Sequence, residues 1–498
     1  MPLVLALDQG TTSSRAIVFD ESGDKRSQTQ VPLPQVYPAP GWVEQDPQLM
    51  WENQLSCARQ AIVEAGATAA DIAALGITNQ RETAIVWDRT TGEPLHNAIV
   101  WQDRRTAEVC DGLLRRGLGD PVREKTGLPL DPYFSATKIA WVLDNVEGAR
   151  ERAAAGDLAF GTVDTWFLWK LTGGTVHGTD VTNASRTLLF DLGRGTWGPE
   201  LLEWLRVPAS LLPTIVPSSG VVGTTAPGVF DAAIPIASLV GDQQAALVGN
   251  GCFSPGEAKA TFGTGIFALM HTGATRVRSQ TLAATVAASS PGALEYALEG
   301  SIFMGGAVVQ WIVESLKLAD SPAAAQRLAE SVPDSNGVIF VPALTGLGAP
   351  EWDPLARGAI FGLTRGATDA HVARAAMEAI PLQLADLMGA MTAESGYRVH
   401  SLRADGGVTV NTLVMQSLAD ILGIEVACAQ MAESTALGAA YLAGRAVGVW
   451  SGPADLPMLR GVAQTYEPAR DAASSARLAD LKVRWAEAVK RSLKWERA

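Results

Sequence analysis

One short segment of the chain combines residue types that could bind a phosphate group. It reads Asp8-Gln-Gly-Thr-Thr-Ser-Ser-Arg15. A turn of small hydroxyl residues presents backbone N–H groups and side-chain donors to an anion, and Arg15 could neutralise a phosphoryl oxygen. Asp8 follows an apolar run and could hold Mg²⁺ directly or through water. A turn containing only GTT is more typical of an ordinary hairpin, but the full run and its repetition in kind at Gly263-Thr-Gly265 favour phosphate binding.

A second segment could recognise a polyol. In Asn79-Gln-Arg-Glu-Thr83, Arg81 could donate hydrogen bonds to the hydroxyls of such a ligand and Glu82 could accept them. Spacing alone favours a surface ion pair at a loop. Each of three aromatic residues, taken alone, is an ordinary candidate for the hydrophobic core. Together with Arg81 and Glu82 they would form a small site with apolar walls and a few polar groups. The aromatic residues are Trp101, Tyr133 and Phe267.

The segment Val240-Gly-Asp-Gln-Gln-Ala245 places an acid directly after an apolar run. Near a bound phosphate, Asp242 would suit a general base that takes the proton of an attacking hydroxyl. The same pattern is typical of a helix N-cap, with the helix starting at Gln243. The residues alone favour neither interpretation.

The segment Asp405-Gly-Gly-Val-Thr-Val-Asn411 follows a strand pattern and leads into a helical one. Its paired glycines would let the backbone approach a flat ring or a phosphate closely, although an ordinary loop is an equally simple reading. The chain contains neither GxxxxGK[ST] nor GxGxxG. A nucleotide would therefore bind without the usual P-loop or Rossmann turn.

The elements that must position these residues follow from hydrophobic patterns. Residues 3–7 and 16–19 predict a β-hairpin, and residues 46–66 predict a helix with Asp46 as its N-cap. Strand patterns at 75–78, 84–87 and 99–101 precede a helix expected near Asp103, which indicates an α/β domain. The strand–turn–strand pattern recurs at 260–270, so the two halves suggest related α/β domains that face each other across a cleft. A closing helix is expected within 471–498.

Composition limits the kinds of partner. The 498 residues carry 39 Lys and Arg against 52 Asp and Glu, a net charge of −13 with pI near 5.0. This balance disfavours a general nucleic-acid or membrane binder and favours a small-molecule partner. Four cysteines lie far apart without a CxxC pattern, as expected for reduced thiols and no zinc site. A signal peptide and a membrane helix are not expected.

These motifs together resemble the FGGY family of carbohydrate kinases, over essentially the full length of the chain. Two long signatures carry the resemblance, one from Tyr133 to Asn145 and one from Gly358 to Glu378. Within the family, the similarity is to members that phosphorylate glycerol, and seven segments carry it. These are DQGTTSSR (8–15), PGWVEQDP (40–47), NQRET (79–83), VWQDRRT (100–106), TNASRT (182–187), GDQQAAL (241–247) and FGTG (262–265).

The resemblance implies duplicated actin-like, ribonuclease-H-like ATPase domains, with ATP in the cleft between them. It implies ATP-dependent phosphorylation of glycerol, with Asp242 as general base and with Asp8 and Asp242 near Mg²⁺. Glycerol would be held by Arg81, Glu82, Tyr133, Asp242 and Gln243, with Trp101 and Phe267 against its carbon skeleton. The ATP site would comprise Thr11, Thr12, Ser13, Arg15, Thr264, Gly306, Gln310, Gly407 and Asn411.

The same resemblance implies domains at 1–250 and 251–445, followed by a helical tail at 446–498. It also implies a cytoplasmic homo-oligomer, a dimer or a tetramer, that binds no nucleic acid and does not insert into a membrane. Some family members carry a basic loop that binds fructose 1,6-bisphosphate, and others carry a histidine that is phosphorylated by a phosphocarrier. The matching segment here, residues 223–231, contains no Lys, Arg or His, so we expect neither control.

Two alternatives stay open at the level of sequence. Another polyol or ketose kinase of the same family would prefer a pentulose or erythritol. Trp101 and the Arg81–Glu82 pair instead suit a three-carbon ligand. An actin-like ATPase acting as a filament or chaperone would hydrolyse ATP without an acceptor.

Overall fold

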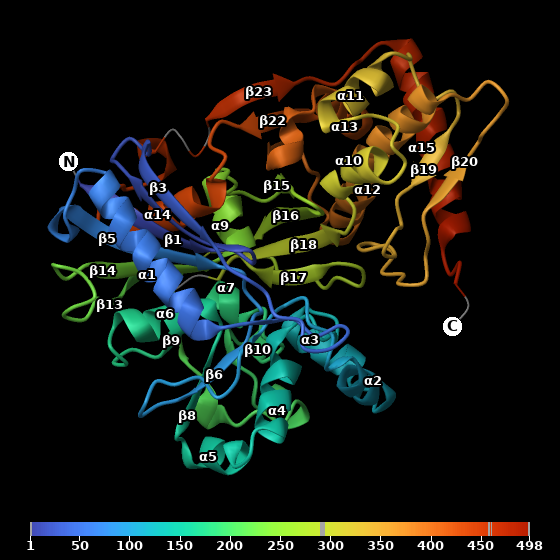
Figure 1. Cartoon of the computed structure of the whole chain (residues 1–498). Helices are drawn as coiled ribbons and strands as arrows, with labels where there is room; N and C mark the ends of the chain where they lie inside the picture. Colours follow the sequence, from blue (N-terminus) through green and yellow to red (C-terminus); the bar gives the residue numbers. More distant parts are fainter. Residues whose placement is uncertain (1, 289–293, 457–458, 460, 497–498) are drawn as a thin grey trace.

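Two mixed β-sheets form the centre of the molecule (Figure 1). The computed structural model describes residues 2–288, 294–456, 459 and 461–496. The first sheet has the strand order β13-β14-β5-β1-β2-β3. Its strands are β1 (Leu3–Gln9), β2 (Ser13–Phe19), β3 (Lys25–Pro32), β5 (Ile72–Asn79), β13 (Ser219–Thr224) and β14 (Pro235–Gly241). The predicted hairpin of residues 3–19 is confirmed as β1 and β2, which pair antiparallel.

The second sheet has the order β17-β18-β16-β15-β21-β22-β23. Its strands are β15 (Glu257–Phe262), β16 (Ile266–Gly273), β17 (Ala283–Val286), β18 (Tyr296–Ile302), β21 (Ser401–Asp405), β22 (Glu425–Ala429) and β23 (Val462–Tyr466). Strand β23 belongs to the segment 446–498, where we expected only helix. It extends the sheet by pairing antiparallel with β22.

The two sheets share one topology. Each sheet contains five strands in the same arrangement, β3-β2-β1-β5-β14 in the first and β18-β16-β15-β21-β22 in the second. In each, the first three strands listed pair antiparallel, and the last two run parallel to the third, which is β1 or β15. In each, an antiparallel strand then closes the edge, β13 on β14 and β23 on β22. The duplication suggested by the repeated strand–turn–strand pattern is therefore confirmed.

Two helices in equivalent positions join the sheets. Helix α9 (Asp242–Gly249) follows β14, and helix α14 (Ser434–Ala446) follows β22. The two helices pack on each other, and α14 also lies on β1, β5 and β14 of the first sheet. Their shared core, which includes Ala245, Val248, Leu437 and Tyr441, is completely or almost completely buried. The second half of the chain thus supplies part of the core of the first sheet.

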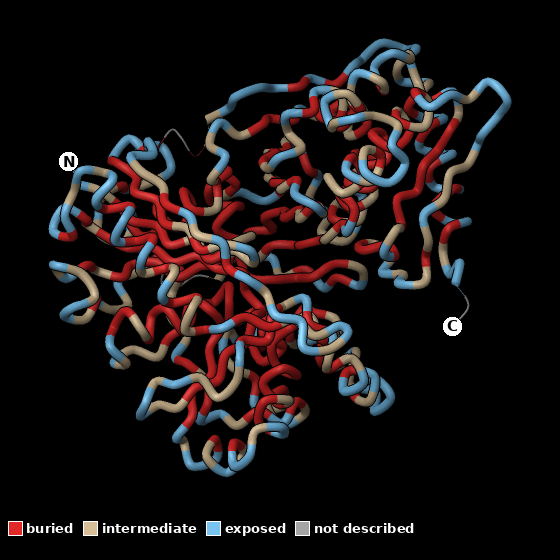
Figure 2. Tube along the Cα trace, viewed as in Figure 1, coloured by how far each residue is buried: buried red, intermediate tan, exposed pale blue. Residues whose placement is uncertain are grey.

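Other helices cover the sheets, and Figure 2 shows the buried chain along the centres of both of them. Helix α1 (Pro47–Glu64) confirms the helix predicted at 46–66, because Asp46 accepts hydrogen bonds from the backbone N–H groups of Gln48 and Leu49. Helices α12 (Asp369–Ser395) and α13 (Thr412–Leu422) contact the second sheet, and α10 (Gly306–Glu314) and α11 (Pro322–Glu330) pack on α12. Helix α15 (Ala472–Ser492) adds side chains to the same hydrophobic core. A short hairpin of β19 (Ile339–Val341) and β20 (Ala359–Phe361) lies beside α12 and α15.

A long insertion between β5 and β14 forms a layer with its own core (Figure 1), except that its helix α6 packs on β5 and β14 in the core of the first sheet. Its helices are α2 (Ala107–Arg115), α3 (Gly119–Thr126), α4 (Ser135–Asn145), α5 (Ala149–Ala155), α6 (Val163–Leu171), α7 (Val181–Ala184) and α8 (Pro199–Trp204). Its short strands are β6 (Ile85–Asp88), β7 (Ala98–Ile99), β8 (Leu158–Gly161), β9 (Gly178–Asp180), β10 (Phe190–Asp191), β11 (Thr196–Trp197) and β12 (Thr214–Val216), and β4 (Glu44–Gln45) pairs with β7.

No helix within the described ranges is long and apolar enough to cross a bilayer. All four cysteines are buried.

Candidate active site

Three neighbouring strands of the first sheet bring the predicted site residues together. Strands β1, β5 and β14 run parallel, and their ends are in register, with Gln9 and Gly241 both opposite Asn79. Asp8 lies near the end of β1, while Asp242 directly follows β14. The loop after β5 carries Arg81. The carboxyl ends of parallel strands meet at one edge of a sheet, so residues from three distant segments share one site.

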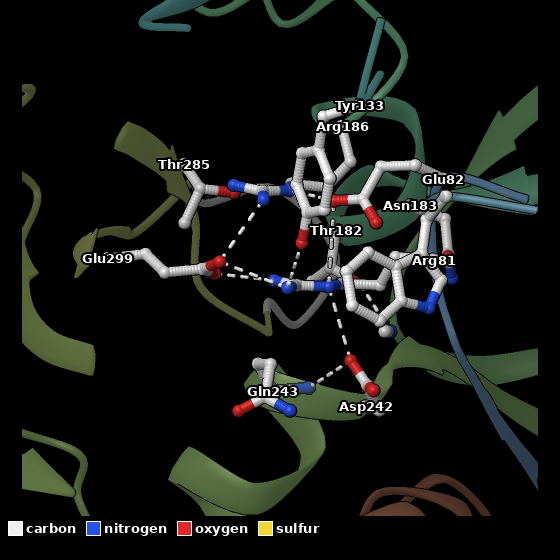
Figure 3. A network of polar contacts seen from close by, with 12 residues as sticks. Arg81, Glu82, Tyr133, Thr182, Asn183, Arg186, Asp242, Gln243, Thr285 and Glu299 are labelled. Atoms are coloured by element: carbon white, nitrogen blue, oxygen red, sulfur yellow. Dashed lines mark hydrogen bonds and ion pairs between the residues drawn. The ribbon is translucent and has the colours of Figure 1, made fainter. Parts of the chain in front are cut away.

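Arg81 is the centre of a buried polar network (Figure 3). Its backbone lies in the left-handed region, with φ of 53°, and its side chain is 3% exposed. The guanidinium forms an ion pair with Asp242, with Nε 3.1 Å from Oδ1, and binds Glu299 through both Nη atoms, with Nη2 3.0 Å from Oε1. Burial opposes the charge, but Glu299, Glu82 and Asp242 raise the pKa of Arg81 well above its usual value.

Glu82 is equally enclosed. Its side chain is 1% exposed and accepts a hydrogen bond from Arg186 Nε at 2.6 Å. Arg186 comes from the loop after α7 and also donates from Nη2 to Glu299 Oε1 at 3.1 Å. The surface ion pair that spacing alone favoured is wrong, because both Arg81 and Glu82 lie inside a network of buried charges.

The three predicted aromatic residues do gather beside this network. The Trp101 ring packs edge to face on Tyr133, with centroids 5.4 Å apart, and on Phe267 at 6.5 Å. The Tyr133 hydroxyl lies 3.5 Å from Arg81 Nη2. Trp101 Nε1 donates to Thr11 Oγ1 at 2.9 Å, which ties this apolar wall to the turn between β1 and β2. Phe267 is on β16, so both halves of the chain contribute to the wall.

Asp242 combines a helix terminus with an open carboxylate. The N-cap of α9 is Gly241, and Asp242 is the first residue of the helix, with Oδ1 2.7 Å from the N–H of Gln243. Its side chain is 28% exposed, far more than Arg81 or Glu82. Burial raises its pKa, an effect that Arg81 opposes. The interpretation of Asp242 as the N-cap is therefore wrong by one residue, and the partly exposed carboxylate is placed where an acid–base role is possible.

The turn between β1 and β2 presents polar groups next to a second carboxylate. Burial raises the pKa of Asp8 to about 6, since Arg15 only partly offsets it and the charge of Asp242 adds to it. Arg15 Nη1 lies 3.7 Å from Asp8 Oδ2, and Arg15 Nε is buried without a protein partner. Thr12 is exposed, and Ser13 Oγ accepts from Gln30 Nε2 at 2.8 Å.

A corresponding turn at the end of β15 meets two other segments. The Gly306 N–H, at the start of α10, donates to the carbonyl oxygen of Gly263 at 2.9 Å. A Cβ on Gly306 would lie 2.8 Å from that oxygen and 3.0 Å from the Val408 side chain, so the three segments touch there. Thr264 and Gly407 are exposed at this junction, and Gln310 is exposed farther along α10. Asn411 is instead buried, and it caps α13 by accepting from the Val414 N–H at 3.1 Å.

Three buried charged residues of the site were not assigned a role from the sequence: Arg186, Lys259 and Glu299. Arg186 lies within TNASRT, a segment that we used only as a mark of resemblance. Lys259 and Glu299 each follow directly after an apolar residue in a strand, Ala258 in β15 and Leu298 in β18, and a charge at such a position is the signal that could have identified them. Lys259 Nζ donates to Gln243 Oε1 at 2.5 Å.

The duplicated strand order, with a polar site between the two sheets, defines an actin-like, ribonuclease-H-like ATPase fold. Models of the FGGY family of carbohydrate kinases match residues 3–249 with the N-terminal domain and residues 258–447 with the C-terminal domain. The chain belongs to the FGGY family of carbohydrate kinases.

Similar proteins extend over the full chain. "Glycerol kinase 2" of Thermotoga maritima is 52% identical over 498 residues, which cover 100% of both chains. "Glycerol kinase" of Leptothrix cholodnii is 54% identical over 499 residues and covers 99% of this chain and 100% of its own. The crystal structure of Plasmodium falciparum glycerol kinase with ADP matches with a TM-score of 0.93 at 35% identity, covering 99% of this chain and 98% of that one.

Proposed function

We propose that the protein is an ATP:glycerol 3-phosphotransferase, which converts glycerol to sn-glycerol 3-phosphate. The observation that carries this proposal is the burial of Arg81 and Glu82 beside the partly open carboxylate of Asp242. Such a site offers a donor, an acceptor and a base within the span of a small polyol. The names of the relatives that match along the whole chain narrow the polyol to glycerol.

Glycerol would be recognised from two sides. Arg81 donates to its hydroxyls and Glu82 accepts from them, while the Tyr133 hydroxyl and the Gln243 amide supply further polar groups. Trp101 and Phe267 cover the carbon skeleton. Protein groups already orient Arg81 and Glu82, so a polyol would meet donors and acceptors in fixed positions.

Phosphoryl transfer would need one proton acceptor at the attacking hydroxyl. Asp242 takes the proton of a terminal glycerol hydroxyl as that oxygen attacks the terminal phosphorus of ATP, and ADP leaves. Its raised pKa brings the carboxylate closer to the range in which a base is effective near neutral pH. Exclusion of water from the closed site would favour glycerol over water as the acceptor.

The nucleotide would lie between the two strand–turn–strand units. Thr11, Thr12, Ser13 and Arg15 offer hydroxyl, N–H and guanidinium groups to its phosphates, and the partnerless Arg15 Nε supports this assignment. The junction where α10 meets the turn after β15 would take the rest of the nucleotide. Its residues are Thr264, Gly306, Gln310, Gly407 and Asn411.

The carboxylates of Asp8 and Asp242 fit Mg²⁺. Both are partly exposed oxygen donors with raised pKa values, and the repulsion between the two carboxylates would be relieved by a divalent cation. When bound, the ion would neutralise charge on the phosphate oxygens. Among the described residues no cluster of three or more His, Cys, Asp or Glu could hold a metal. Domain limits at 250 and 445, a cytoplasmic location and a homo-oligomer stay predictions.

Release of ADP with and without an acceptor tests the proposal. Purified protein with ATP and Mg²⁺ should release ADP in proportion to added glycerol, and the phosphorylated product should be glycerol 3-phosphate. Erythritol or a pentulose used faster than glycerol would indicate another kinase of the family. ADP release that is independent of any acceptor would indicate an ATPase and would contradict the proposal.

A further inference from the structure

The second half of the chain places two charged side chains inside the polyol site of the first half. Glu299 lies on β18 and Lys259 on β15, and both side chains are almost completely buried. In Figure 3, Glu299 points toward the guanidinium groups of Arg81 and Arg186 from the side opposite Glu82. Burying charges is costly unless they are paired, so these contacts constrain the approach of the two halves.

Glu299 fixes the orientation of Arg81. Its carboxylate binds both Nη atoms of Arg81, the two-pronged arrangement that holds a guanidinium plane in one orientation. That plane directs Nε to Asp242 at 3.1 Å. Burial opposes the charge of Glu299, but Arg186 and Arg81 outweigh it and lower its pKa to about 2. Glu299 is therefore a carboxylate throughout the pH range in which enzymes are usually assayed.

Lys259 contacts Gln243, the residue that follows Asp242 in the chain. Its Nζ donates to Gln243 Oε1 at 2.5 Å and to Thr261 Oγ1 at 2.9 Å. The carbonyl oxygen of the Gln243 amide is thereby engaged, which leaves its NH₂ group to donate to an acceptor. Arg81 and Gln243 both belong to the first half, yet each is oriented by a charged residue of the second half.

We propose that Glu299, assisted by Lys259, is a positioning residue that assembles the polyol site only when the two halves are apposed. Polyol recognition is then coupled to domain apposition through the Arg81–Glu299 pair. The inference rests on the proposed function, because it assigns Arg81 and Gln243 to glycerol. Glu299 itself acts through Arg81.

Replacement of Glu299 by Gln tests the coupling. E299Q keeps the size of the side chain but removes the charge that fixes Arg81. We expect KM for glycerol to rise about 10- to 100-fold, with KM for ATP changed by less than about 3-fold. The reason is that Arg81, which loses its fixed orientation, binds the polyol and not the nucleotide. The conservative variant E299D keeps the charge on a shorter side chain and should recover part of the loss. It also serves as the test variant if E299Q does not fold.

Glu378 provides the matched control. It is a buried carboxylate on α12 that pairs with Arg374 at 2.8 Å and Arg477 at 3.6 Å, away from the polyol network. E378Q should lower thermal stability without changing KM for glycerol. An E299Q enzyme with unchanged KM for glycerol, or with equal changes in KM for glycerol and ATP, would overturn the positioning role. If the unmodified protein shows no glycerol-dependent ADP release, the proposed function itself fails, which is a separate result.

Discussion

Asp242 is held by its neighbours in a way that leaves one oxygen for chemistry. Arg81 Nε and the N–H of Gln243 both approach Oδ1, at 3.1 and 2.7 Å. Oδ2 is therefore the oxygen suited to accept a proton from an attacking hydroxyl. At this scale one carboxylate oxygen maintains the structure and the other is available to react.

Replacement of Asp242 by Asn should remove the proton acceptor while keeping the shape of the side chain. General-base catalysis contributes about 10²–10⁴ in rate, so kcat should fall by that factor in the glycerol-dependent ADP-release assay. D144N, which changes a carboxylate in an ion-pair cluster with Arg150 and Arg206, should retain the rate of the unmodified protein. Near-normal turnover by D242N would exclude Asp242 as the base.

The raised pKa of Asp8 predicts a loss of activity in mild acid. This carboxyl has a pKa of about 6, so it gains a proton as the pH falls through that value and loses the charge suited to a cation. Because Asp8 and Asp242 influence each other, the acid limb of kcat/KM near pH 6 belongs to the pair. A pH–rate profile from 5 to 8 tests this expectation, and a flat profile down to pH 5 would contradict it.

At the scale of elements, helix α6 begins with a buried acid that should make stability depend on pH. Asp164 accepts hydrogen bonds from Thr162 and Thr179, while burial and the nearby charge of Asp180 raise its pKa to about 7. The pKa in the unfolded chain is about 3.9, so the folded state holds the extra proton between those values. The free energy of unfolding therefore falls as the pH rises from about 4 to 7.

Replacement of Asp164 by Asn should flatten this dependence. Between pH 5.5 and 8, the unmodified protein should lose on the order of 2 kcal/mol of unfolding free energy relative to D164N. Denaturant melts at several pH values measure the difference in slope. Parallel slopes for the two proteins would show that Asp164 is ionised throughout this range.

The elements that the sequence predicts best are those with strong local signals. The hairpin at 3–19 and helix α1 follow from apolar periodicity and from the cap at Asp46. Helix α2 begins at Ala107, four residues after the predicted start, because the buried Asp103 carboxylate accepts a hydrogen bond from the distant Val43 N–H at 2.6 Å. That hydrogen bond is a tertiary contact and leaves no mark on helical periodicity.

The site residues differ in the same way: some belong to local sequence motifs, and others are brought into the site only by contacts between distant segments. Arg81, Glu82 and Asp242 follow strand patterns and belong to motifs, so the sequence could identify them. The contact between Arg81 and Glu299 joins positions 218 residues apart, and only the approach of two sheets creates it. Spacing within a segment cannot indicate such a pair, and for this reason spacing alone favours a surface position for Arg81.

At the scale of the whole molecule, two glycines allow α9 and α14 to cross closely. A Cβ on Gly249 would lie 1.8 Å from the carbonyl oxygen of Ser434, and one on Gly438 would lie 1.9 Å from that of Ala245. These distances are far below van der Waals contact, and both obstructing atoms belong to backbone. The two sheets can therefore adopt this arrangement only if neither position carries a side chain.

Replacement of Gly438 by Ala should disrupt this crossing. We expect a loss of more than about 3 kcal/mol in unfolding free energy or an insoluble product, because overpacking here displaces helix backbone. Thermal melts and gel filtration measure the effect. G389A is the control: Gly389 lies within α12 with open space around it, so alanine should be neutral or stabilising by about 0.5–1 kcal/mol. Equal melting temperatures for the two variants would contradict the steric argument.

The placement of α14 also sets the order of events during synthesis on the ribosome. Strand β14 ends at Gly241, but the helix that covers that face of the first sheet starts only at Ser434. At a translation rate of about 5–20 residues per second, roughly 10 to 40 s pass between the synthesis of β14 and the synthesis of α14. During that interval the apolar face of the first sheet is available to chaperones, so expression yield should respond to translation speed across the second half of the message.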